Sequence, residues 1–153
     1  MQPALRVGRS LPQEAEWEGL EMIRTTIAVA ALVVSVSGAL AAGDPAAGEI
    51  VFKKCAACHA VGEGAKNKVG PELNAVLGRT AGTLEGYSYS QAMKDAGAGG
   101  VVWTPETLAE YLPKPRDFVK GTKMSFPGLP NPDDLTNVIA YLATFSPDFK
   151  PAQ

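Results

Sequence analysis

Both cysteines and the single histidine of this 153-residue chain lie within five consecutive positions, at Cys55, Cys58 and His59. A scaffold held by several disulfides needs more cysteines, and a zinc site with four Cys or His ligands needs a fourth donor. Both classes are therefore excluded. Any chemistry that uses thiols or imidazole is concentrated in this one short segment.

The spacing Cys-x-x-Cys-His is typical of covalent haem attachment. Two thiols three positions apart on one helical turn can each bond to one haem vinyl group, and the adjacent imidazole then lies under the iron. A thioredoxin-type thiol pair would need a βαβ context, and a disulfide between such near neighbours would close too small a loop. We therefore predict one haem c, attached through Cys55 and Cys58 and ligated by His59.

An apolar, uncharged run at residues 27–42 follows Arg24 and ends in small residues, Ala39-Leu40-Ala41. It is shorter than the roughly 20 residues that cross a bilayer comfortably, and its end fits a signal peptidase site. We predict a signal peptide at residues 22–41 and export to the periplasm. The alternative is that residues 27–42 remain as a membrane anchor.

Residues 1–21 carry four glutamates and two arginines, whereas the start of a signal peptide is basic. We interpret them as a non-native upstream extension and expect translation to start at Met22. Residues 42–153 then form one domain with a formal charge of −1, because three basic and four acidic residues precede it. Charge alone therefore predicts no nucleic-acid binding.

Capping residues followed by proline mark three helix starts, at Asp44-Pro45, Thr104-Pro105 and Asn131-Pro132. Shorter helical pieces are expected at 71–77 and 90–94, and an irregular loop at 116–130. No strand is predicted. The domain is therefore expected to be all-α, with long loops rich in Gly and Pro, and a large flat cofactor would supply part of its core.

The second iron ligand follows by elimination. No second histidine exists, and the sulfur donors of residues 42–153 are Met93 and Met124. Met93 lies in an expected helix, whereas Met124 lies in a loop that can wrap the far haem face, so Met124 is predicted. A thioether favours reduced iron, and six-coordinate iron leaves no open position. Electron transfer is therefore favoured over the enzyme alternatives, a haem peroxidase or a thiol-disulfide oxidoreductase.

From about residue 44 to 145 the sequence resembles the class I c-type cytochromes, the small soluble mitochondrial and alphaproteobacterial type. The matching motifs are Gly48 with Phe52, the segments 68–71, 78–79, 87–89, 111–112 and 121–124, Trp103, Phe126, and Tyr141-Leu142. The resemblance implies the small cytochrome c fold, in which the N- and C-terminal helices pack together around a covalently attached haem.

The resemblance also implies roles for single residues. Pro71 would orient His59 through its carbonyl, and Tyr111 would place its hydroxyl near the Met124 sulfur. Arg79, Tyr89 and Trp103 would hold the haem propionates. Met93 departs from the pattern, because many relatives have an asparagine there.

Six lysines lie near the haem-binding segments in sequence: Lys53, Lys54, Lys66, Lys68, Lys120 and Lys123. Such a ring would steer the protein to acidic sites on redox partners. The partners implied are a cytochrome bc-type complex, a terminal oxidase, a reaction centre or a periplasmic reductase. We expect a monomer with no small-molecule substrate.

Overall fold

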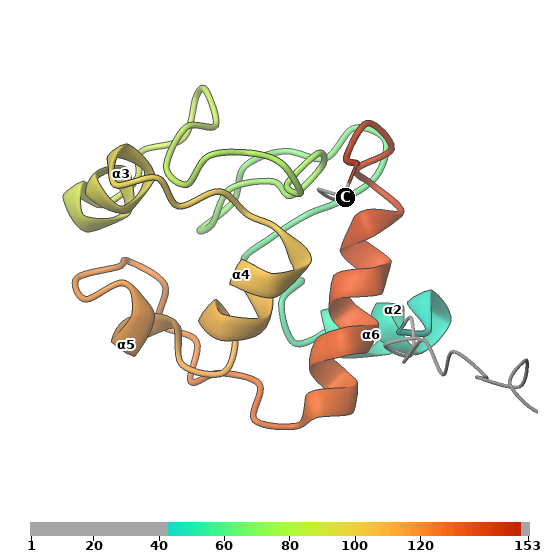
Figure 1. The fold of residues 1–153 in the computed structure, drawn as a ribbon. Coiled ribbons are helices and arrows are strands. Elements are labelled where there is room, and N and C mark those ends of the chain that lie inside the picture. Colours follow the sequence, from blue (N-terminus) through green and yellow to red (C-terminus); the bar gives the residue numbers. More distant parts are fainter. Residues whose placement is uncertain (1–42, 151–153) are drawn as a thin grey trace, which may run out of the picture. The chain divides into compact units, whose positions relative to one another are not determined.

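The computed structural model describes residues 43–150, which form one all-α unit (Figure 1). Its helices are α2 (Pro45–Phe52), α3 (Gln91–Ala98), α4 (Pro105–Tyr111), α5 (Pro115–Phe118) and α6 (Pro132–Ala143). Within these residues there is no strand, and the one isolated β-bridge joins Thr80 to Val102. The predicted extension at 1–21 and signal peptide at 22–41 lie outside the described residues. No helix in 43–150 has both the length and the apolar character needed to span a bilayer.

The three predicted capped helix starts are confirmed. The Asp44 side chain accepts a hydrogen bond from the N–H of Ala46, and Asn131 accepts from Asp133 and Asp134. Thr104 forms a reciprocal capping box. In each case a side-chain oxygen satisfies an N–H that the first helical turn leaves unpaired.

The helical piece predicted at 71–77 is wrong, because this segment consists of turns. Ala75 has a φ of 50°, and its N–H donates to the carbonyl of Phe145 at 2.7 Å. The Arg79 guanidinium donates to the carbonyl of Asn74 at 3.2 Å. Since the Ala75 N–H is bonded to a residue far away in sequence and the Asn74 carbonyl to a side chain, neither group takes part in a helical ladder.

Two further differences concern helix length. The predicted helix at 90–94 extends to Ala98, so Gly97 lies inside α3 rather than ending it. A side chain at Gly97 would collide with the Ala81 carbonyl, so the glycine permits this close approach. The loop expected at 116–130 overlaps a single helical turn, α5, with a proline at its first position.

The first and last described helices cross at a glycine, as expected from the pairing of Gly48 and Phe52 with Tyr141 (Figure 1). A Cβ at Gly48 would collide with the carbonyl oxygen of Asn137. The Phe52 and Tyr141 rings lie 5.4 Å apart between centroids. This crossing fixes α2, and with it the Cys55 segment that follows directly.

The Lys54 amine lies 2.7 Å from the Asp134 carboxylate and links the end of α2 to α6. Nearby, the backbone N–H of Asp44 donates to the side-chain oxygen of Asn137 at 2.8 Å. These polar contacts flank the apolar crossing and set how the two helices are oriented.

Gly48→Ala is expected to destabilise the fold, because the added methyl group has no space at the helix crossing. Overpacking of this kind costs about 1–3 kcal/mol. Denaturant unfolding of the purified protein measures the loss. Gly99→Ala is the control, since Gly99 has a φ of −77° and a Cβ there would lie 3.3 Å from its nearest neighbour. Equal unfolding free energies for the two variants would contradict this account of the crossing.

Candidate functional site

All nine residues singled out in the sequence line one cavity of about 280 Å³. They are Cys55, Cys58, His59, Pro71, Arg79, Tyr89, Trp103, Tyr111 and Met124. Apolar side chains from α2, α4 and α6, among them Phe52, Leu108 and Leu142, line it as well. The fold therefore brings together groups that are up to 69 positions apart in the sequence.

The His59 ring is fixed by a hydrogen bond. Its Nδ1 lies 2.7 Å from the carbonyl oxygen of Pro71, and a carbonyl can only accept, so Nδ1 carries the hydrogen. Burial lowers the pKa of His59, and this outweighs the Pro71 carbonyl, which raises it. The ring is therefore neutral, and the lone pair of Nε2 is available to a metal.

Gly70 packs against the same imidazole. A Cβ at this position would lie 2.8 Å from Nδ1 and closer still to Cε1. The backbone N–H of Gly70 also donates to the carbonyl of Cys58 at 2.9 Å. The ring is thus held by a glycine backbone on one side and by the Pro71 carbonyl at its edge.

The two thiols lie on turns that continue the chain from α2. The N–H groups of Cys58 and His59 donate to the Cys55 carbonyl at 3.0 and 2.9 Å, so the motif forms one helical turn as predicted. The two thiols form no disulfide with each other. Burial raises the pKa of the Cys55 thiol to about 11. A thiol-disulfide oxidoreductase needs a lowered thiol pKa, so this geometry argues against that alternative.

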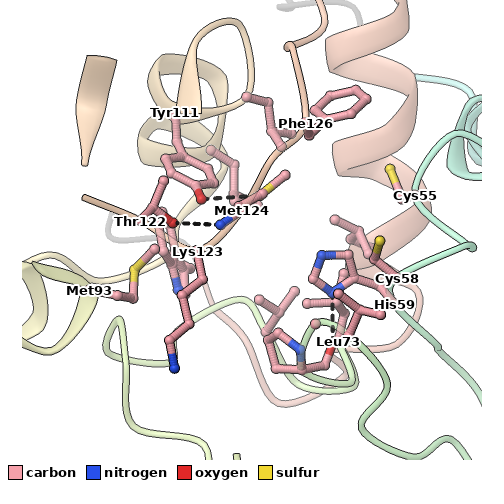
Figure 2. Close-up of a pocket in the computed structure, with 18 of the residues that line it drawn as sticks. Cys55, Cys58, His59, Leu73, Met93, Tyr111, Thr122, Lys123, Met124 and Phe126 are labelled. Carbon is pink, nitrogen blue, oxygen red and sulfur yellow. Dashed lines mark hydrogen bonds between the residues drawn. The ribbon is translucent and has the colours of Figure 1, made fainter. Parts of the chain in front are cut away.

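Met124 lies across the cavity from His59 (Figure 2). The Tyr111 hydroxyl donates to the Met124 sulfur at 3.2 Å, and the Met124 N–H donates to the Thr122 hydroxyl at 3.2 Å. Burial raises the pKa of Tyr111, which keeps its hydroxyl protonated and able to donate. The sulfur is therefore oriented by its own loop and by α4.

Arg79, Tyr89 and Trp103 are among the residues that contribute polar groups to the lining. Arg79 donates to the carbonyls of Glu72 and Asn74, each at 3.2 Å, and lies 3.9 Å from the Glu72 carboxylate. Within residues 43–150, no hydrogen-bond partner is found for the indole N–H of Trp103, which lines the cavity. Burial raises the pKa of Tyr89 against the opposing effect of Arg79.

The donor set fits a haem. Two thiols lie beside an imidazole nitrogen on one wall, and a thioether lies on the opposite wall. In the described residues no group of three or more His, Cys, Asp or Glu side chains could hold a bare metal ion. The apolar lining suits a porphyrin, which would supply the other ligands of an iron held at this site.

Comparison with known proteins decides the family. The protein-family model for cytochrome c matches residues 45–146. The chain belongs to the cytochrome c family. A cytochrome c2 from Agrobacterium tumefaciens (strain II Chrys) is 55% identical over 111 residues, which cover 72% of this chain and 99% of the relative. A cytochrome c-550 from Ancylobacter novellus is 54% identical over 104 residues, covering 68% and 97%.

The fold comparison agrees. The solved structure of cytochrome c2 from Rhodospirillum centenum superposes with a TM-score of 0.66 at 47% identity, covering 69% of this chain and all of that one. This chain is accordingly an electron carrier with one covalent haem c, and it is not an enzyme. The predicted fold class, cofactor and electron-transfer role are confirmed.

Several residues that the sequence analysis named, but did not predict as site residues, contact the site. Tyr87, Lys123 and Met93 line the cavity, and Lys68 donates to the Ala56 carbonyl inside the attachment motif at 2.9 Å. Met93 is buried, and it lies on the same face of α3 as the buried Gly97. No periodic signal marks the tyrosine and the lysines, since their acceptors are backbone carbonyls far away in sequence.

Gly70→Ala is expected to displace the His59 ring, because the methyl group would occupy the space of the imidazole. The loss of unfolding free energy should be about 1–3 kcal/mol, and the Nδ1–H should exchange with solvent faster, as measured by NMR. Gly48→Ala is the matched control: it should destabilise the protein without changing the imidazole signal. An unchanged imidazole signal in Gly70→Ala would contradict the packing described here.

Proposed function

We propose that His59 and Met124 are the two axial iron ligands of a periplasmic one-electron carrier. The observation that supports this most is the placement of the His59 nitrogen and the Met124 sulfur on opposite walls of one cavity, beside both thiols. The haem, when bound, supplies a one-electron Fe(II)/Fe(III) couple. The tasks of the protein are to hold it, to exclude water and to set its surroundings.

On the His59 side, the chain fixes orientation and electron donation. The Pro71 carbonyl accepts the Nδ1 hydrogen, which holds the tautomer and makes Nε2 a stronger donor. On the opposite side, the Tyr111 hydroxyl withdraws electron density from the Met124 sulfur. The hydrogen bond from His59 strengthens Nε2 as an electron donor, whereas the hydrogen bond from Tyr111 weakens the Met124 sulfur as a donor.

Arg79, Tyr89 and Trp103 are proposed to receive the haem propionates. Their donors line the cavity, and a buried carboxylate is costly unless charged or hydrogen-bonding groups meet it. Arg79 already binds the Glu72 and Asn74 carbonyls. We infer that Arg79 binds one propionate and the backbone at Glu72 and Asn74 at the same time.

The proposed location rests on the predicted leader. Cleavage after Ala41 would release a domain of residues 42–153 that acts in the periplasm as a monomer, and residues 1–21 would be a non-native extension. The thioether attachment through Cys55 and Cys58 suits this location, because it prevents haem loss outside the cytoplasm. The anchored alternative would leave the carrier facing the same compartment.

The proposed partners are membrane redox complexes, such as a cytochrome bc-type complex, a terminal oxidase or a reaction centre, and periplasmic reductases. Two lysines of the predicted ring are fixed without losing their charge, since Lys68 and Lys123 donate to the carbonyls of Ala56 and Ser88. Lys54 is paired with Asp134, which cancels its charge locally. The positive charge is therefore spread unevenly over the ring of lysines, and we expect steering to come from the lysines that have no acidic partner within residues 43–150.

Met124→Leu is expected to abolish the methionine–iron band in the far-red spectrum of the oxidised protein and to produce a high-spin spectrum. The reason is that leucine keeps the volume but removes the sulfur donor. The wild-type protein should give low-spin c-type spectra in both redox states. These spectra test the proposed function directly.

Met93→Leu is the matched control for Met124→Leu, because Met93 is the other methionine that lines the cavity. It should keep the low-spin spectrum and the methionine–iron band. If the band were lost in Met93→Leu and kept in Met124→Leu, the axial assignment would be overturned.

Lys66→Gln is expected to slow electron transfer to an acidic partner by about two- to threefold at low ionic strength, with the difference vanishing at high salt. Stopped-flow kinetics with a cytochrome bc-type complex at several salt concentrations would measure it. Lys150→Gln, which removes a lysine outside the predicted ring, is the charge-matched control. A rate independent of salt would count against steering.

A further inference from the structure

The irregular segment at residues 86–90, here called the brace, is bonded to the loops of both proposed iron ligands. The Tyr87 hydroxyl donates to the Val69 carbonyl at 2.6 Å. From the other side, the Lys123 amine donates to the Ser88 carbonyl at 2.8 Å. Val69 lies two positions before Pro71, and Lys123 directly precedes Met124.

The loop at 67–71 is tightly constrained on the His59 side. The Asn67 side chain donates to the Gly86 carbonyl at 3.2 Å, a second bond to the brace. Gly70 contacts the imidazole so closely that a Cβ there has no space. A shift of the Val69 carbonyl would therefore be transmitted through Gly70 to the Pro71 carbonyl, which holds His59.

The loop on the Met124 side is also constrained by close contacts. A Cβ at Gly121 would lie 3.3 Å from the Cβ of Ala92, on the helix that follows the brace. The Thr122 hydroxyl accepts the N–H of Met124. The Lys123 amine ties this loop to the brace at the position directly before Met124.

Tyr87 and Lys123 line the haem cavity, and so does Val69, whose carbonyl Tyr87 binds. Both hydrogen bonds lie at the solvent-exposed side of this cavity, where Val69 is 78% exposed. The Tyr87 ring also packs edge-on against Tyr89 at 4.7 Å between centroids, which keeps its hydroxyl aimed at the 67–71 loop. Each side chain thus reaches from the cavity wall to a backbone carbonyl.

We propose that Tyr87 and Lys123 are positioning residues that couple the two axial ligands mechanically through the brace. A change at the His59 loop then alters how firmly Met124 is held, and a change at the Met124 loop alters how firmly His59 is held. This inference rests on the His59 and Met124 ligation proposed above. The coupling acts through geometry and needs no titration or added partner.

The first test is Tyr87→Phe, which removes only the hydroxyl that bonds to the His59 loop. Imidazole competes with Met124 for ferric iron, and its binding is followed by optical titration of the holoprotein at constant pH. Imidazole should bind about three- to tenfold more tightly to the variant, the range expected for loss of one hydrogen bond. Tyr141→Phe, which removes a hydroxyl from α6, should bind imidazole as the wild type does.

The reciprocal test is Lys123→Ala, read at the opposite ligand. Exchange of the His59 Nδ1–H with solvent, measured by NMR of the reduced holoprotein, should become about three- to tenfold faster. Lys94→Ala, a lysine on α3 outside the brace, should leave the exchange rate unchanged. In the double variant Tyr87→Phe with Lys123→Ala, the increase in imidazole affinity should be less than the product of the two single effects.

The proposal is overturned if Tyr87→Phe binds imidazole only as tightly as the wild type does. It is overturned as well if the effects of Tyr87→Phe and Lys123→Ala on imidazole affinity multiply independently. It is also overturned if Tyr141→Phe changes imidazole binding as much as Tyr87→Phe does. If Tyr87→Phe does not accumulate as folded protein, the exchange measurement on Lys123→Ala decides alone. Failure of the ligation itself is recognised separately, because the wild-type oxidised spectrum would then lack the methionine–iron band.

Discussion

The hydrogen bond between the His59 ring and the Pro71 carbonyl is the contact on which the rest of the site depends. It connects the attachment motif to a loop that has no helical structure of its own, and it determines which ring nitrogen faces the cavity. The loop in turn is held by Gly70, by Arg79 through the Glu72 carbonyl, and by Tyr87. Much of the irregular backbone in this small domain thus serves to keep one imidazole in place.

Much of the fold could be predicted because its signals are local. A capping side chain followed by proline marks the starts of α2, α4 and α6, since the capping bonds form between residues two or three positions apart. The proposal of Met124 as an iron ligand followed from elimination among few sulfur donors, and the resemblance to the cytochromes supplied the polar residues expected in the lining. These inferences needed little knowledge of the tertiary structure.

The errors and omissions share one physical cause. Apolar residues at Leu73, Val76 and Leu77 have helical spacing, yet the backbone there is bonded to the carbonyl of Phe145, which is close only in three dimensions, and to the side chain of Arg79. The same is true of the Tyr87 and Lys123 bonds, whose acceptors are backbone carbonyls 18 and 35 positions away. A carbonyl acceptor carries no residue-type signal, so such bonds leave no pattern in the sequence.

The crossing of α2 and α6 has a consequence for how the chain folds. The Asp44 and Asn137 groups that meet there are 93 positions apart, so closing this contact is costly in chain entropy and must wait for nearly the whole chain. The attachment motif follows α2 directly and is complete long before α6 has been made. Since burial in the folded domain raises the pKa of the Cys55 thiol to about 11, the thiol is more reactive while the chain is still unfolded. The order of events favoured by this topology is covalent attachment first and closure of the terminal helices afterwards.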